Sequence, residues 1–239
     1  MKSLIHHLFP GPLLSLSMRG IFAMMIMAVA FMPASAKNRV AADTITAAKA
    51  FLKYPQQDLD LLTESMRQDM LDYMVERDSI YKKSNIYMGL SWIETMKPDY
   101  MNIHLSDVSS LQIKLLPCPG RLPIVMTLYT VDDGNGTADT TVKFFDNSMK
   151  QLPTDRYLKV PAPKDFYDVR KDAPVSVKDI EDEMPFYTIA MTVNPSTGAL
   201  TGRLTSADGL SPEQQRLLSP YIRQTLLWTW TGRRMKLMN

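Results

Sequence analysis

YMNIHLSDVSSLQIKLLPCPGRLPIVMTLYTVDDGNGTADTTVKFF, residues 100–145, is the stretch of sequence that decides the fold. Apolar residues such as Met101, Ile103 and Leu105 alternate with polar ones. The alternating runs lie at 101–105, 111–115, 124–128 and 142–145. A period of two is typical of half-buried β-strands, because successive side chains point to opposite faces. The stretch therefore predicts an antiparallel meander with one apolar face that needs a cover.

Two polar segments separate the longer strands of this meander. Residues 117–120, Pro-Cys-Pro-Gly, hold two prolines that cannot donate to a strand ladder, so we predict a loop there. Residues 132–136, Asp-Asp-Gly-Asn-Gly, contain the Asn-Gly pair that favours a tight hairpin. The oxygens of Asp132, Asp133, Asn135 and Asp139 suit calcium, but their order does not follow the EF-hand pattern. We interpret this segment as a plain turn and predict no metal site.

The residues before the meander supply its cover. Asp43 precedes apolar residues at helical spacing up to Pro55, which predicts a first helix of about three turns. Ser65 and Gln68 form a capping box ahead of a second amphipathic helix. The fold class is therefore α+β, with an N-terminal helix pair over the antiparallel meander in residues 37–152.

The second half of the chain repeats a smaller sheet-plus-helix unit in residues 186–239. Five prolines among charged residues mark 153–185 as an extended connector, where we place the internal domain boundary. Residues 186–204 predict a hairpin, and Ser211-Pro-Glu-Gln214 predicts a short helix with a capping box, from Pro212 to about Tyr221. A final strand, or a hairpin through Gly232, closes the chain at 225–237.

The N-terminal residues 1–36 are typical of a signal peptide. An apolar run from Ile21 to Met32 is followed by Ala34-Ser-Ala36, a cleavage signature, and the run is shorter than the ~20 residues that span a bilayer. We therefore expect an exported protein, periplasmic or secreted, with no transmembrane segment after cleavage. No cysteine lies at the cleavage point, which disfavours a lipid anchor.

Charge and cysteine content exclude several classes of partner. Removing Lys2 and Arg19 with the leader from the 27 basic residues leaves 25, equal to the 25 acidic residues. Without a basic field, nucleic acid is not an expected partner. Cys118 is the single cysteine, so an exported chain without an internal disulfide depends on its core for stability.

The sequence lacks the common catalytic motifs. His104 is the one histidine that remains after cleavage, which excludes a two-histidine zinc site, and nothing brings it to Cys118. The Gly-x-Ser-x-Gly elbow, the phosphate loop and the dinucleotide motif are all absent, so we predict no cofactor and no catalytic residue. Acids such as Asp99, Asp107, Asp132 and Asp133 leave a two-carboxylate hydrolase open as an alternative.

Two groups of residues are candidates for a binding surface. Trp228 and Trp230 alternate beside Arg233. Large aromatic residues in a closing strand are expected in the core, and the arginine is expected at a charged strand edge; an aromatic, basic platform for glycan or peptide is the alternative. The second group is a helical stripe of methionines, which fill cores and also line binding grooves. This stripe consists of Met66, Met70 and Met74.

Several short segments of the chain resemble an uncharacterised family of secreted Bacteroidales proteins, domain of unknown function 3256. They lie at 105–117, 142–146, 150–153, 161–166, 210–213 and 228–233. The resemblance covers nearly all of the chain after residue 36 and implies an exported α+β protein of an envelope-dwelling bacterium. It implies no activity and no site residue.

These observations favour a soluble, non-catalytic exported protein that binds another cell-envelope component. The Met-rich helix face or a free sheet edge is the expected surface, since strand addition at an edge is a common recognition mode. A glycan-binding module using Trp228 and Trp230 and an acid-based hydrolase are the alternatives.

Overall fold

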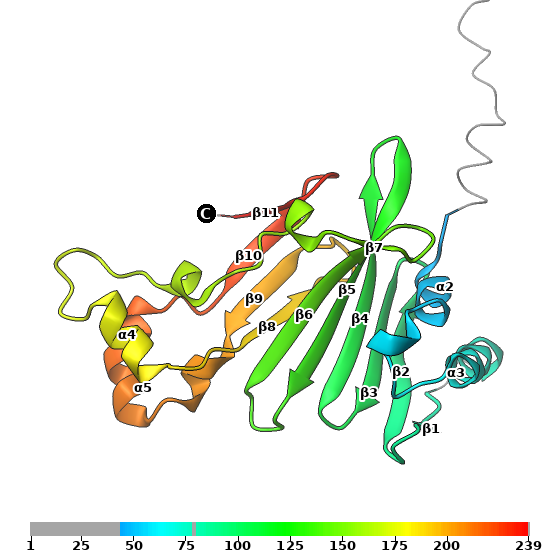
Figure 1. The fold of residues 1–239 in the computed structure, drawn as a ribbon, viewed down its shortest axis with the longest axis horizontal. Helices are drawn as coiled ribbons and strands as arrows, with labels where there is room; N and C mark the ends of the chain where they lie inside the picture. Colours follow the sequence, from blue (N-terminus) through cyan, green and yellow to red (C-terminus); the bar gives the residue numbers. More distant parts are fainter. Residues whose placement is uncertain (1–43, 78–79, 239) are drawn as a thin grey trace, which may run out of the picture. The chain divides into compact units, whose positions relative to one another are not determined.

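In the computed structural model, which describes residues 44–77 and 80–238, the chain forms a seven-stranded and a four-stranded antiparallel sheet (Figure 1). The large sheet runs in chain order through β1 (Lys83–Ser84), β2 (Leu90–Lys97), β3 (Tyr100–Ser106), β4 (Ser109–Cys118), β5 (Arg121–Asp132), β6 (Ala138–Phe145) and β7 (Gln151–Leu152). The small sheet has the order β11-β10-β9-β8, with β8 (Ile189–Val193), β9 (Leu200–Leu204), β10 (Leu226–Trp230) and β11 (Met235–Leu237). The helices are α2 (Ala47–Leu52), α3 (Glu64–Arg77), α4 (Val177–Glu183) and α5 (Pro212–Leu218).

The predicted α+β class and the meander are confirmed. β3 to β6 pair in register along the predicted runs, for example Ile103 with Leu111 and Met126 with Phe144. The hairpins β8–β9 and β10–β11 and the capping box of Ser211 and Gln214 are also present. Among the described residues, no helix has the length and apolarity needed to cross a membrane. The predicted signal peptide, residues 1–36, lies outside the described residues.

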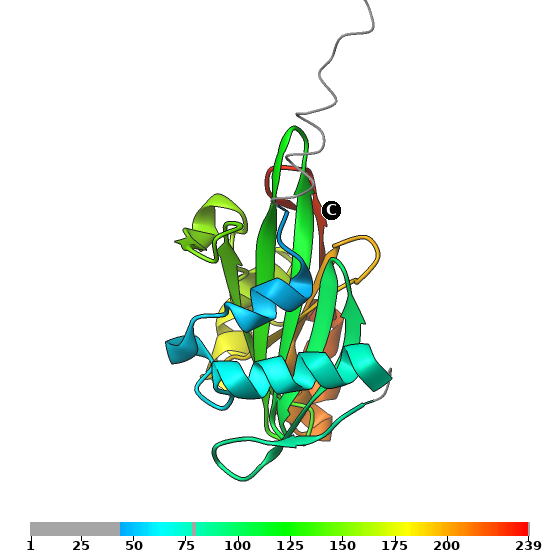
Figure 2. The same cartoon turned by 90° about the vertical axis from the view of Figure 1, so that its right-hand side faces the viewer.

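Helices α2 and α3 cover one face of the large sheet, and Figure 2 shows both crossing in front of its strands. Phe51 and Met70 are fully buried in the cluster that includes Ile113 and Phe145 of the sheet. Full burial of such a side chain contributes about 1.5–3 kcal/mol. The apolar face that the alternation predicts is therefore the face under the helices.

Both helices begin at residues other than those predicted. The cap of α2 is Thr46, whose hydroxyl accepts a backbone hydrogen bond of 3.2 Å. Asp43, the predicted cap, lies outside the described residues. Ala47 N donates to Pro98 O of the sheet (2.9 Å), so a tertiary contact helps to set the start of α2. Thr63, not Ser65, accepts the bond at the start of α3, and α2 has 6 residues, not three turns.

Strand β8 docks across the other face of the large sheet, the face opposite the one predicted to need a cover. Its outward N–H groups donate to side chains of the large sheet. These bonds are Ile189 N to Asp139 Oδ1 (3.0 Å), Met191 N to Thr140 Oγ1 (2.9 Å) and Val193 N to Gln112 Oε1 (3.2 Å). They run from β6 to β4, so β8 crosses the strands and its own edge is already occupied.

The proline-rich segment 153–185 does more than connect two halves. It contains α4 and two short 3-10 turns, and it buries Leu158, Phe166 and Ile180 in the same cluster as Trp228 of the small sheet. The prediction of a surface connector is wrong in this respect, because prolines mark irregular backbone but do not prevent side chains from entering a core. The described residues fall within one compact unit.

The β4–β5 and β10–β11 turns lie against each other. Pro117 and Cys118 belong to β4, contrary to the predicted loop, and the ladder shifts register between Leu116 and Cys118. The irregular position tolerates a proline because no ladder bond is lost there. Gly232 (φ +83°) lies so close to Pro119 that a Cβ on it would be 2.9 Å from the proline ring. This contact brings two distant segments together at the site described next.

Candidate functional site

The methionine stripe of α3 faces the core. Met70 is 1% exposed, and Met66 and Met74 are half-buried against the same cluster. The stripe therefore covers the sheet, and the described structure offers no open Met-rich groove on this helix face.

The two tryptophans of β10 do not form an exposed platform. Trp228 is 4% exposed and packs against Gly202, where the absence of a Cβ leaves room for the indole ring. Trp230 is half-buried, and its Nε1 donates to Pro117 O (2.7 Å). The alternative in which both indoles stack on a glycan is wrong, because Trp228 is buried.

Arg233 does reach a cavity, which forms where the two turns meet. The cavity has a volume of about 710 Å³ and is lined by residues of the β4–β5 turn, the β10–β11 turn and the segment after β7. Its cationic residues are Arg121, Arg156, Arg233 and Arg234, and we call it the arginine cavity. Leu122, Ile124 and Tyr157 supply apolar walls. The volume is within the range of ligand sites, about 300–1,000 Å³.

Local contacts hold these segments in place. Trp230 bonds to Pro117, and Met235 N donates to Tyr157 O (2.7 Å), which ties the β10–β11 hairpin to the segment after β7. The ring of Tyr157 stacks on Phe144, with centroids 5.1 Å apart. The guanidinium of Arg156 lies 5.8 Å from the Tyr157 ring centroid, a cation–π contact. The walls of the cavity are therefore anchored in the core, and the charged groups lie on exposed side chains.

The arginine cavity carries positive charge that the described protein does not compensate. No carboxylate lines it, and in the described part of the chain no ion pair joins a carboxylate to any of the four guanidinium groups. Burial raises the pKa of the Cys118 thiol in its wall, which disfavours a thiolate there. An anion is the group that such a site attracts, and guanidinium forks pair with planar oxyanions in bidentate geometry.

A second cavity of about 290 Å³ adjoins the first. Arg156, Tyr157 and Arg234 line both. The second cavity adds the cations Lys159 and Lys236 and the carboxylates of Asp155 and Asp165. Asp165 Oδ2 accepts a hydrogen bond from Ala162 N (2.8 Å), so part of this negative charge is already used.

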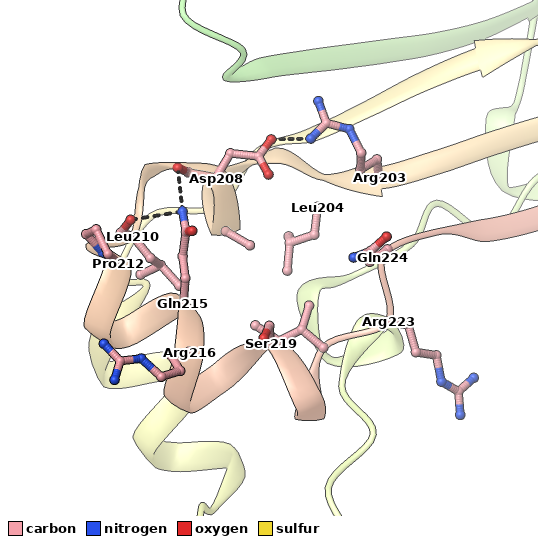
Figure 3. Close-up of a pocket in the computed structure, with 12 residues that line it drawn as sticks. Arg203, Leu204, Asp208, Leu210, Pro212, Gln215, Arg216, Ser219, Arg223 and Gln224 are labelled. Carbon is pink, nitrogen blue, oxygen red and sulfur yellow. Dashed lines mark hydrogen bonds and ion pairs between the residues drawn. The ribbon is translucent and has the colours of Figure 1, made fainter.

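A separate cavity of about 490 Å³ lies between β9 and α5 (Figure 3). Arg203 is paired with Asp208, and the amide of Gln215 donates to the carbonyls of Asp208 (3.1 Å) and Leu210 (3.0 Å). Figure 3 shows Arg216 and Arg223 pointing away from it. Its charged groups are thus compensated or turned outward, and we do not assign it a ligand.

The structure does not assemble a nucleophilic or acid–base site from the residues considered in the sequence. His104 pairs across the ladder with Ser110, and Cys118 lies eight residues further along β4. At ~3.3 Å per residue the two are roughly 26 Å apart. The imidazole stacks on Trp92 with ring centroids 4.2 Å apart.

Three of the candidate acids, Asp99, Asp132 and Asp133, have structural contacts. Asp99 Oδ2 binds Lys114 Nζ (2.5 Å), and Asp132 Oδ1 accepts from Gly134 N (2.9 Å). Hydrogen bonds from the backbone N–H of Asn135 and then that of Thr137 lower the pKa of Asp133, the opposite of what a general acid needs. None of Asp99, Asp107, Asp132 and Asp133 lines the cavities described above.

The 132–139 segment forms a closed turn. Asp133 Oδ1 accepts from Asn135 N (2.8 Å) and Thr137 N (3.1 Å), and Asp139 is engaged by β8. Within the described ranges, no three His, Cys, Asp or Glu residues are grouped so as to hold a metal ion. These carboxylates act as caps of the backbone in this turn.

Sequence reasoning missed most of the arginine cavity. It singled out Arg233 because of the neighbouring tryptophans, but Arg121 and Arg156 come from distant segments with no shared motif. A local signal was the short Pro-Gly turn directly before Arg121, since turns lie on the surface and often carry binding residues.

The chain was compared with protein families, curated proteins and solved structures. The family described as "protein of unknown function (DUF3256)" matches residues 39–235, which confirms the family predicted from the sequence. A domain of an uncharacterized protein from Porphyromonas gingivalis W83 has a similar structure, with a TM-score of 0.67 and 19% identity, covering 80% of this chain and 98% of that chain. At this identity the likeness shows the fold alone. No curated protein matches.

Proposed function

The chain belongs to the family of proteins of unknown function DUF3256, and we propose that this member is an exported, non-catalytic protein that binds an anionic cell-envelope component in the arginine cavity. Export is supported by the apolar run before Ala34-Ser-Ala36. A binding role is supported by the cavity, and a non-catalytic role by the structural contacts of Asp99, Asp132 and Asp133.

One observation carries the proposal: four arginines surround a 710 Å³ cavity that no carboxylate lines. The residues after position 36 hold equal numbers of acids and bases, so this cluster is not the by-product of a basic chain. Like charges gathered in a concave site repel one another and raise the local concentration of anions. The four guanidinium groups lie on exposed side chains, where one charge pair contributes about 0.2–1 kcal/mol, so recognition rests on several of them acting together.

The test is a calorimetric titration of the purified protein with three anionic probes: trigalacturonate, a heparin-derived tetrasaccharide and a hexaglutamate peptide. We expect at least one to bind, with an affinity that falls as salt rises. The variant R233Q/R234Q should lose at least about tenfold in affinity, the equivalent of roughly 1.4 kcal/mol.

The matched control is R170Q/K171Q, which removes the same charge from two exposed residues outside the arginine cavity. It should bind as the wild type does. If no probe binds at low salt, or if both variants lose affinity equally, the arginine cavity is not the site and the proposal fails.

A further inference from the structure

The cationic side chains continue from the arginine cavity into its neighbour. Arg156 and Arg234 line both cavities, and Lys159 and Lys236 extend the series beyond them. A small anion would occupy one cavity and leave the lysines without a role. A chain with acidic groups at intervals would contact the whole series.

We infer that the ligand is a linear anionic polysaccharide, carrying carboxylate, sulfate or phosphate groups along its length, that occupies both cavities at once. This inference rests on the proposed function and specifies its ligand class. The four guanidinium groups of the arginine cavity bind the oxyanions, and the two ammonium groups bind further acidic groups of the same chain.

The acids of the second cavity fit a sugar chain. Asp155 and Asp165 offset part of the positive charge there, so this cavity adds less electrostatic attraction than the first. Their carboxylates accept hydrogen bonds from hydroxyl groups, which every sugar residue offers. A polymer with acidic groups and no hydrogen-bond donors, such as a polyphosphate, would meet only repulsion from these two side chains.

A peptide finds fewer partners at this surface. β11 lines the second cavity together with Trp228 of β10, and the β11 N–H at Met235 already donates to Tyr157 O (2.7 Å). Strand addition would need that edge to be free. The lining of both cavities mixes cations with apolar residues and does not form the continuous apolar groove that the face of an amphipathic helix needs.

The experiment is a length series measured by calorimetry on the purified protein. Dimers, tetramers and octamers of galacturonate and of heparin-derived saccharide separate carboxylate from sulfate as the charged group. Malto-oligosaccharides of the same lengths are the neutral controls, and octaglutamate is the peptide control. The variants are R121Q/R233Q for the first cavity, K159Q/K236Q for the second, and R170Q/K171Q outside both.

The octamer of at least one acidic series should bind at least about tenfold more tightly than its dimer, with a steeper dependence of log K on log salt. R121Q/R233Q should weaken all lengths. K159Q/K236Q should weaken the octamer about tenfold and leave the dimer unchanged. The control R170Q/K171Q should match the wild type.

Three results would overturn the inference while the proposed function stands. One is an affinity that does not grow with length, and another is a K159Q/K236Q variant that binds octamers as the wild type does. The third is octaglutamate binding more tightly than both acidic octasaccharides. Neutral saccharides that bind as tightly as acidic ones would overturn the electrostatic basis of the site itself.

Discussion

Replacing Thr140 by valine tests how the two sheets are joined. Thr140 Oγ1 accepts from Met191 N (2.9 Å) and lies 2.9 Å from Thr130 Oγ1. Valine has nearly the same shape, so packing is kept while the acceptor is lost. Met191 is 2% exposed, and its N–H would remain without this partner.

The expected cost follows from that N–H group. An unsatisfied buried donor costs about 1–3 kcal/mol, so we expect T140V to lower the free energy of unfolding by about 2 kcal/mol. For a unit of this size, 1 kcal/mol corresponds to about 2–4 °C in Tm, which gives a decrease of about 4–8 °C. Urea unfolding followed by circular dichroism measures the first quantity, and a thermal scan measures the second.

The neighbouring Thr141 provides the control. It is exposed on the same strand, so T141V should change the free energy of unfolding by less than about 0.5 kcal/mol. If T140V and T141V unfold at the same urea concentration with equal slopes, the bond from β8 to Thr140 does not contribute to the docking of the sheets.

Three further predictions concern stability and reactivity. Arg67 is 2% exposed, and its Nη1 donates to the carbonyls of Phe51 (3.1 Å) and Tyr54 (2.7 Å). R67M should therefore lower the free energy of unfolding in urea by about 2–4 kcal/mol, whereas the same substitution of an exposed arginine should change it little. An R67M variant as stable as the wild type would contradict this. Burial by itself would raise the pKa of Asp146, but hydrogen bonds from its turn outweigh this effect and the pKa is lowered. The ionised carboxylate therefore stabilises the fold above the unfolded pKa of about 3.9, and this stabilisation is lost as pH falls through the folded pKa. The free energies of unfolding of wild type and D146N should converge at acid pH, and a difference that does not depend on pH would refute the assignment. Because burial raises the pKa of Cys118, alkylation by iodoacetamide at neutral pH should be slower than that of free cysteine and should accelerate at alkaline pH; a fast reaction at neutral pH is the opposing result.

Local patterns determined the elements, and long-range contacts determined what the patterns could not show. Alternation located β3 to β6, and the Ser211 capping box located α5, because both signals depend on residues a few positions apart. The same alternation labelled Gln112 as polar, but it could not tell that the partner of this side chain is β8 and not water.

The candidate site shows the same limit more strongly. Arg121, Arg156 and Arg233 lie far apart in the chain and meet because Gly232 packs on Pro119 and the Tyr157 carbonyl binds the β10–β11 hairpin. The tryptophans drew attention to Arg233 for a reason that proved structural, since Trp228 fills the core. No spacing within one segment could have identified the cavity.

An NMR titration of the isotopically labelled protein with octagalacturonate and with the heparin-derived octasaccharide is the most direct test of binding in the arginine cavity. The chain has three tryptophans, and the indole N–H of Trp230 binds Pro117 O beside the cavity, whereas Trp92 stacks on His104 in another part of the sheet. We expect the resonances of Trp230 Nε1 and of the four arginine Nε groups to shift together with one Kd for at least one ligand, while Trp92 stays in place. Shifts centred on Trp92, or none at these five groups with either ligand, would contradict binding in the arginine cavity.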